Sequence, residues 1–138
     1  MRRASGTVEI AVTRRVLIVD DHPDSADLLA LWLEQDGHET RTALDGVSGL
    51  SAAIEFQPDV AVLDLSLPPS DGYELARAIR ARPELSKCRL IAVSGYDDDA
   101  DRARSASAGF ERHLRKPVNL QELTSAVRVQ ASERASEA

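Results

Sequence analysis

The sequence predicts an α/β fold, a doubly wound parallel sheet of five strands with helices on both faces. Short runs rich in Val, Ile and Leu alternate with longer stretches whose apolar residues repeat at helical spacing, and five such units fill about 120 of the 138 residues. The strongest strand-like runs are apolar throughout, which is typical of strands covered on both sides. Ligands of such sheets bind beyond the carboxyl ends of the strands, so functional residues are expected there.

The first unit pairs an apolar run, residues 16–19, with a helix that opens at Pro23. Proline suits the first turn of a helix, and Gly37 supplies a stop signal at the far end. Residues 39–43 form a weaker strand pattern, which favours a place nearer the edge of the sheet. The apolar stripe predicted to be buried on the helix consists of Leu28, Leu29, Trp32 and Leu33.

The second unit continues with a helix opened by Asp45 and ended by Pro58, and the strongest strand pattern follows at residues 60–63. This strand ends at Asp64. The helix is predicted to bury one apolar face, made of Val47, Leu50 and Ile54.

The third unit is a helix whose start is marked by Asp71 and Glu74 at capping-box spacing. Its predicted buried residues are Leu75 and Ile79, and Pro83 closes it. Residues 90–93 then form a fourth strand.

The last two units carry weaker signals. The helix predicted over residues 97–108 is apolar only through alanines, so it buries little surface and is expected to be the loosest. A short strand around Leu114 ends at Lys116 and Pro117. A final helix begins at Asn119, and its predicted buried residues are Leu120, Leu123 and Val127.

Composition excludes several classes of protein. With 17 basic and 23 acidic residues the net charge is −6, which argues against a nucleic acid as a direct ligand. No stretch approaches the roughly 18 apolar residues of a membrane helix, and the first 15 residues lack the apolar core of a signal peptide, so we expect a cytoplasmic protein without a membrane partner. Cys88 is the single cysteine, which excludes a disulfide framework and a cysteine zinc cluster.

The predicted domain organisation is a basic N-terminal tail (1–14), one domain (15–131) and a C-terminal tail (132–138). Residues 1–15 hold four arginines against one glutamate, a pattern typical of a solvated tail. The residues after the last helix are too few for a DNA-binding or enzymatic output domain. We therefore expect a single-domain protein whose output comes from docking or from passing a group on.

Five residues that carry chemistry stand at the predicted strand ends: Asp20, Asp21, Asp64, Ser94 and Lys116. Three carboxylates at one edge repel one another unless a hard cation neutralises them, and Mg²⁺ takes few carboxylates together with waters and phosphate oxygens. A hydroxyl and an ammonium beside them suit the oxygens of a transferring phosphoryl group. The nucleophile is then a carboxylate that forms an aspartyl phosphate.

Each of these residues also has an ordinary structural interpretation. Asp20 and Asp21 suit the start of a helix, Asp64 a turn, Ser94 a loop, and Lys116 a solvated edge. All of them, however, fall in order at the carboxyl ends of the first, third, fourth and fifth strands. Independent coincidence at four strand ends is improbable, which favours the functional interpretation.

These residues lie in motifs that resemble the receiver domain of two-component response regulators, which is CheY-like. The resemblance covers about residues 15–129 and implies a flavodoxin-like fold with strand order 2-1-3-4-5. The matching motifs are VLIVDD at 16–21, VLDLSLP at 62–68, DGYE at 71–74, SGY at 94–96 and KP at 116–117. The sequence around residues 108–117 is similar to that of receivers associated with hybrid histidine kinases, which favours a phosphorelay role.

The resemblance implies that Asp64 accepts a phosphoryl group from a histidine kinase or histidine phosphotransfer protein. It implies that Mg²⁺ is held by Asp21, Asp64 and the backbone carbonyl of Ser66, with Asp20 contributing through water. The domain would then catalyse only its own phosphorylation and dephosphorylation. The resemblance also implies that the domain can form a weak homodimer. The sequence does not specify the downstream target protein.

Ser94 and Lys116 are implied to contact the phosphoryl oxygens, and the bond from Lys116 to Pro117 to be cis. The sequence departs from the family pattern at His113, where the switch position normally holds Tyr or Phe. Two interpretations of His113 stay open: an exposed strand histidine, or a switch side chain that moves with Ser94. Tyr96 and Ser66 both occupy positions that modulate the rate of dephosphorylation in this family.

Three other functions fit the sequence less well. A receiver-like interaction module that is never phosphorylated is disfavoured by the complete set of reactive residues. An FMN-binding flavodoxin needs a hydroxyl- and glycine-rich phosphate loop, where this chain has the acidic run Asp20-Asp21-His22-Pro23-Asp24. A phosphohydrolase that uses an aspartyl phosphate needs an acid two residues after the nucleophile, where this chain has Ser66.

Overall fold

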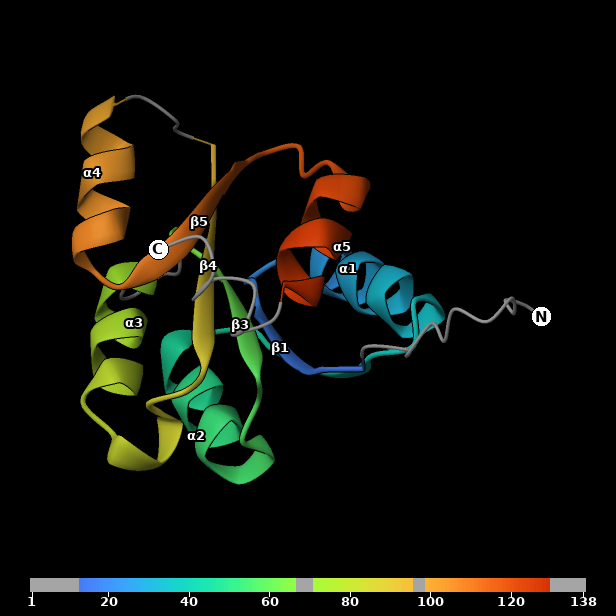
Figure 1. Cartoon of the computed structure of the whole chain (residues 1–138), viewed down its shortest axis with the longest axis horizontal. Coiled ribbons are helices and arrows are strands. Elements are labelled where there is room, and N and C mark those ends of the chain that lie inside the picture. Colours follow the sequence, from blue (N-terminus) through green and yellow to red (C-terminus); the bar gives the residue numbers. More distant parts are fainter. Residues whose placement is uncertain (1–12, 67–70, 96–98, 130–138) are drawn as a thin grey trace, which may run out of the picture.

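The computed structural model describes residues 13–66, 71–95 and 99–129, and these residues form a parallel five-stranded sheet between two layers of helices (Figure 1). The strand order is β2-β1-β3-β4-β5, so the predicted fold class and strand order are confirmed. The strands are β1 (Arg15–Val19), β2 (Glu39–Ala43), β3 (Val60–Asp64), β4 (Arg89–Ser94) and β5 (Phe110–Arg115).

The helices follow the strands in alternation, as in any chain of right-handed βαβ units. They are α1 (Pro23–Gln35), α2 (Gly46–Phe56), α3 (Gly72–Arg80), α4 (Asp99–Ser107) and α5 (Leu120–Arg128), with a 3₁₀ turn, η1, at Pro83–Leu85. None of the helices within the described ranges is both long and apolar enough to cross a bilayer.

Alternate residues of the strands feed two separate cores, because successive side chains of a strand point to opposite faces. On one face α2 and α3 pack on the sheet, and on the other α1 and α5 do (Figure 1). Leu17, Leu63 and Leu90 belong to the first core, and Ile18 and Ile91 to the second. This double coverage explains why the central strands read as unbroken apolar runs.

The predicted helix starts rely on side-chain caps. Asp45, Asp71 and Asn119 each accept a hydrogen bond from the backbone N–H three residues on, at 2.7, 2.9 and 2.9 Å. Such caps satisfy one of the backbone donors that a helix start leaves unpaired. At the other end of α1, Gly37 has φ +96°, a backbone conformation that favours glycine.

Two of the predicted buried positions are wrong. Leu28 on α1 is 55% exposed and Val47 on α2 is 83% exposed. The helices turn smaller residues to the sheet instead, including Ala30 on α1 and Gly49 and Ala53 on α2. Gly49 allows close approach, because an added Cβ would lie 3.0 Å from a methyl carbon of Leu75 and 3.2 Å from Val19.

The start of the helix predicted over residues 97–108 falls partly outside the described residues, as does Tyr96. Within the described part of α4, Ser105 is the buried side chain and Ala103 and Ala106 are exposed. The helix therefore contributes little apolar burial, in keeping with its alanine-only pattern.

Candidate functional site

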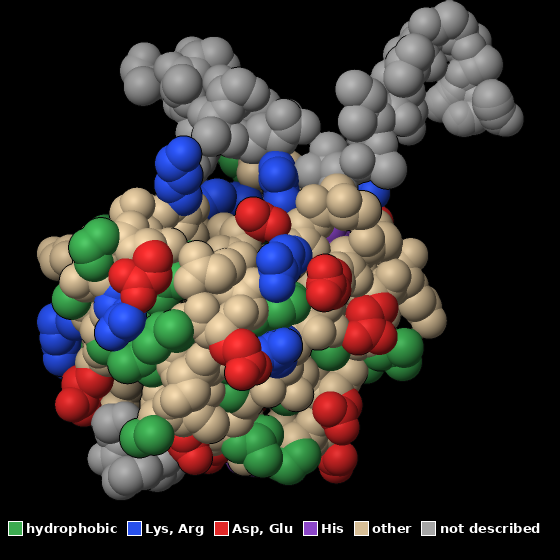
Figure 2. Space-filling view, turned by 90° about the horizontal axis from the view of Figure 1, so that it is seen from below, with side chains coloured by type: hydrophobic (Ala, Val, Ile, Leu, Met, Phe, Trp, Pro, Cys, Tyr) green, Lys and Arg blue, Asp and Glu red, His purple; other side chains and the backbone are tan. Residues whose placement is uncertain are grey.

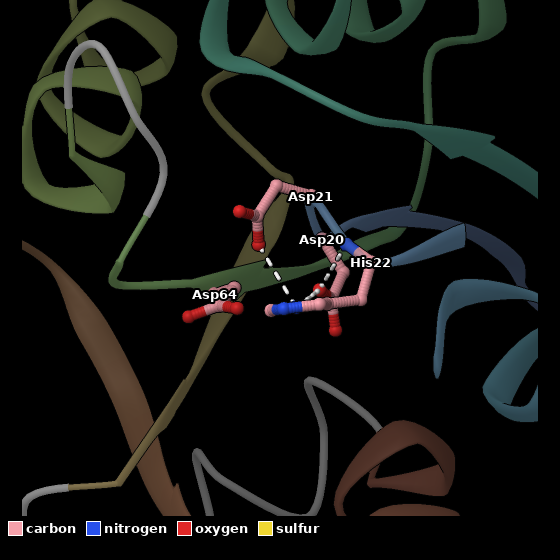
Figure 3. A group of neighbouring side chains, drawn as sticks. All are labelled: Asp20, Asp21, His22 and Asp64. Atoms are coloured by element: carbon pink, nitrogen blue, oxygen red, sulfur yellow. Dashed lines mark hydrogen bonds and ion pairs between the residues drawn. The ribbon is translucent and has the colours of Figure 1, made fainter. Parts of the chain in front are cut away.

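Four potential ligand side chains converge beyond the carboxyl ends of β1 and β3. Asp20, Asp21 and His22 directly follow β1, and Asp64 is the last residue of β3, the neighbouring strand. Each contributes one atom to a group in which all atoms lie within 4.8 Å of one another. Figure 3 shows the three carboxylates and the imidazole turned toward a common point. The parallel register thus brings residues 43 positions apart together.

Asp64 is buried and held at both of its carboxylate oxygens. Its side chain is 3% exposed, its Oδ1 accepts a hydrogen bond from the Ser66 N–H at 2.9 Å, and its Oδ2 accepts one from Lys116 Nζ at 2.8 Å. These two donors fix the orientation of the carboxylate.

Asp20 is also buried, with its Oδ1 accepting a hydrogen bond from the His22 N–H at 2.9 Å. Asp21 differs, because its Oδ1 is buried and has no hydrogen-bond partner. The Nδ1 of His22 lies 3.1 Å from that oxygen but does not meet the geometry of a hydrogen bond. A buried carboxylate oxygen without a partner is costly, and a cation at this point would satisfy it.

The donor set at this point fits a hard divalent cation. Asp20, Asp21 and Asp64 supply carboxylate oxygens, which Mg²⁺ prefers, and the one nearby ammonium does not balance three negative charges. Asp21 is also only half-buried, so this group of carboxylates is partly exposed to solvent.

Lys116 reaches the carboxylates from the loop after β5. Its backbone N–H donates to the carbonyl of Ser94 at 2.8 Å, and its peptide bond to Pro117 is cis. Partial burial lowers the pKa of Lys116, but the hydrogen bond to Asp64 and the charges of Asp64, Asp20 and Asp21 raise it by more. The net pKa lies above its ordinary value, so Lys116 stays a cation at neutral pH.

Ser94 and Ser66 occupy the same edge of the sheet. Ser94 is the last residue of β4, next to β3, and is 3% exposed, whereas the Ser66 side chain is exposed and its backbone is held by Asp64. The start of α3 also closes on this edge, because an added Cβ at Gly72 would lie 2.5 Å from the Asp64 carbonyl oxygen. Glycine is therefore required there.

His113 lies on β5, the strand next to the one that ends at Ser94. The residue is buried, with 8% of its surface exposed. The interpretation of this histidine as an exposed strand residue is wrong. Its Nδ1 lies 3.1 Å from the hydroxyl oxygen of Ser105 on α4, so it joins the edge strand to the helix beside it.

The His22 side chain is 69% exposed. It nevertheless lies 3.3 Å from Asp20 and 3.1 Å from Asp21 through the same nitrogen, Nδ1. The sequence signal for this contact is the position of His22 directly after two aspartates, because a short loop keeps the imidazole ring close to them.

The surface gives no sign of a continuous basic stripe on the face shown in Figure 2, where acidic and basic side chains of the described residues are intermixed. A phosphate-backbone footprint would gather Lys and Arg on one face.

Comparison with known proteins gives a consistent result. Residues 16–128 match the family model for the response regulator receiver domain. The DNA-binding dual master transcriptional regulator RpaA of Synechocystis is 31% identical over 114 residues, which are 83% of this chain and 47% of that protein. The chain thus spans about half the length of this curated relative.

Two solved structures show the same architecture. A response regulator from Chloroflexus aurantiacus, described there as putative, aligns with a TM-score of 0.78 at 31% identity, covering 83% of this chain and 94% of that one. A CheY-like receiver domain protein from Methanospirillum hungatei has a TM-score of 0.78 at 30% identity, covering 91% and 99%.

Proposed function

The chain belongs to the response regulator receiver domain family, and on that premise we propose that it accepts a phosphoryl group on Asp64 from a histidine kinase or histidine phosphotransfer protein. It then signals through a change of conformation or passes the group on in a phosphorelay. The observation that carries the proposal is the buried Asp64 carboxylate, held by Ser66 and Lys116 beside two further carboxylates.

The residues of this edge divide the work of phosphoryl transfer. A carboxylate oxygen of Asp64 attacks phosphorus, and the bond from phosphorus to the donor nitrogen breaks. The ammonium of Lys116, already 2.8 Å from Oδ2, offsets the negative charge that gathers on the phosphoryl oxygens. The Ser66 N–H keeps Oδ1 in place, so little reorganisation is needed at the moment of reaction.

Asp21, Asp64 and the Ser66 carbonyl are the groups that would hold Mg²⁺, with Asp20 acting through water. When bound, the ion supplies neutralisation of phosphoryl charge. Oδ1 of Asp21 supports this assignment, because it is a buried ligand atom that accepts no hydrogen bond from the described residues.

Ser94 is the proposed hydroxyl donor to the phosphoryl group, and His113 the proposed switch side chain. Their strands are neighbours, and His113 reaches α4 through Ser105. Movement of Ser94 toward a phosphoryl oxygen would therefore be passed to α4 through β5. Unchanged partner affinity of His113→Ala, with and without phosphorylation, would remove this role.

Phosphorylation is tested with acetyl phosphate and Mg²⁺, with intact-mass spectrometry as the readout. We expect the added mass of one phosphoryl group on the native chain, none on Asp64→Asn, and an undiminished gain on Asp24→Asn, an exposed aspartate on α1. Labelling of the Asp64→Asn protein equal to the native chain would refute the assignment. Profiling against histidine kinases then identifies the donor.

A further inference from the structure

A second candidate site lies between α3 and α4, in a groove of about 660 Å³ that shares no residue with the carboxylate edge. Three arginines line it: Arg77 and Arg80 from α3, and Arg104 from α4. The rest of the lining includes the Tyr73 ring and the small residues Ala81 and Ala108. The groove therefore combines an apolar floor with cationic walls.

The charges of this groove are poorly balanced. Among the described residues, no carboxylate lies within 4.0 Å of the guanidinium of Arg77 or Arg80, and Arg104 reaches Asp71 only at 3.9 Å. Arg77 and Arg80 are three residues apart, so they are neighbours on one helix face and repel each other. Some arginines elsewhere meet acidic partners closely, as Arg82 does with Glu84 at 2.6 Å.

Helix dipoles explain part of this arrangement, because all three arginines stand in the last turns of their helices. They do not explain why guanidinium groups from two helices border one cavity in a chain of net charge −6. An anion bound between them would remove the repulsion, and paired guanidinium groups bind phosphate oxygens well.

The floor of the groove suits a flat ring. The guanidinium carbon of Arg104 lies 3.9 Å from the centre of the Tyr73 ring, so one face of the guanidinium is stacked. The Arg104 side chain is 62% exposed, which leaves its other face open to the groove. An aromatic base placed there would extend the stack of Tyr73 and Arg104.

The turn after α4 packs closely against the Arg80 side chain. Gly109 has φ +100°, where glycine is favoured, and an added Cβ would lie 3.1 Å from Arg80 Nε. Glycine thus lets the Arg80 side chain lie against the turn, with its charged end at the edge of the cavity.

We propose that this groove binds a nucleotide, with its phosphates between Arg77 and Arg80 and its base stacked on Arg104. The proposal does not depend on phosphorylation of Asp64. The expected ligand has a flat ring that stacks on Arg104 and more than one phosphate for Arg77 and Arg80, which meet no carboxylate among the described residues.

The test is isothermal titration of the full chain in EDTA with ATP and GTP as probes, beside adenosine and tripolyphosphate. We expect at least one nucleotide to bind about tenfold or more tightly than either fragment, because ring and phosphates both contribute. No nucleotide binding, or equal affinity for tripolyphosphate, would overturn the proposal.

Variants locate the site. Arg77 and Arg80 are exposed, so Arg77→Ala and Arg80→Ala should leave the fold intact. Each substitution should weaken nucleotide binding about tenfold or more, because a charge-assisted hydrogen bond is lost. Arg112→Ala, an exposed arginine on β5 outside the groove, is the matched control and should keep native affinity. Equal losses of nucleotide affinity in all three variants would indicate a general charge effect and would contradict binding in this groove.

Two further variants separate the claims. Arg104→Lys keeps the charge but loses the planar stack, so the preference for nucleotide over tripolyphosphate should shrink toward one. A preference kept in full would overturn the stacking of the base. Asp64→Asn should bind the nucleotide as the native chain does, and loss of binding there would instead place the nucleotide at the carboxylate edge.

Discussion

Charged side chains gather at both ends of the sheet, and the two clusters are built differently. At the amino ends of the strands, Arg89 is 7% exposed and donates to Glu111 at 2.6 Å and to the carbonyl oxygens of Ala126 and Val127. At the carboxyl ends, three carboxylates face one ammonium, and the buried Oδ1 of Asp21 accepts no hydrogen bond from the described residues.

A second part of the amino-end cluster shows the same completeness. His38 accepts the Arg14 N–H at Nδ1, and its Nε2 lies 3.0 Å from Asp36, which also accepts two hydrogen bonds from Arg128. The Arg14 guanidinium donates to three carbonyls at the end of α5. This cluster satisfies itself, whereas the carboxyl-end cluster needs a ligand, and that difference separates a structural set of charges from a functional one.

The largest expected effect is at the self-satisfied end. Arg89→Ala removes the guanidinium that donates to Glu111 and to two helix carbonyls, so the free energy of unfolding should fall by about 3–5 kcal/mol. Urea denaturation measures it. Arg82→Ala, which removes an exposed pair with Glu84, is the control and should cost less than about 1 kcal/mol. Similar losses in both would erase the contrast between the two ends.

The opposite sign is expected at the carboxyl ends. Asp21→Asn removes one of three repelling charges, so the metal-free protein should gain stability on the order of 1 kcal/mol. Native protein should gain about 2.7 kcal/mol at a Mg²⁺ concentration a hundredfold above its Kd, and the variant much less. Thermal unfolding with Mg²⁺ and with EDTA measures both. A variant that loses stability without metal would show that the charge of Asp21 stabilises the metal-free fold, and would contradict the repulsion.

The pH dependence of the Lys116 pair is the third test. The pKa of folded Lys116 lies above the ordinary 10.5, so the stabilisation by its ammonium is complete below that pH and is lost as pH rises through the folded pKa. The difference in unfolding free energy between native protein and Lys116→Met, followed from about pH 9 to pH 12, isolates this contribution. A difference that is constant or grows with pH would contradict the raised pKa.

The smallest effect is expected at the exposed margin of the amino-end cluster. Arg128 is 57% exposed, so Arg128→Ala should cost less than about 1 kcal/mol despite its two hydrogen bonds to Asp36. The loss should shrink in high salt, which screens exposed pairs. A cost near that of Arg89→Ala would mean that the whole network is one cooperative unit.

Much of the fold was readable because its signals are local. The continuous apolar strands and the caps at Asp45, Asp71 and Asn119 depend on neighbours within a few residues, and the structure has each of them. Burial on the helices was less readable. Leu28 and Val47 fit an apolar stripe, but the residues turned to the sheet include Ala30 and Gly49, because close helix packing favours small side chains.

The amino-end cluster had no sequence signal at all. His38 and Arg14 are 24 positions apart, and Arg14 lies 113 residues from the Val127 carbonyl that it contacts. Neither residue stands in a motif, and a buried histidine looks the same in sequence as an exposed one. The same holds for the groove of Arg77, Arg80 and Arg104, which two helices build together.

The sequence by itself determined the order of the elements and the residues that end each strand, because apolar periodicity and strand-ending residues are local features of the chain. The tertiary structure alone decided which oxygen of Asp21 is buried without a hydrogen bond, that Lys116 meets Asp64 at 2.8 Å, and that His113 is buried against α4. These facts depend on distances between separate segments, and such distances exist only once the sheet has formed and the helices have packed on it.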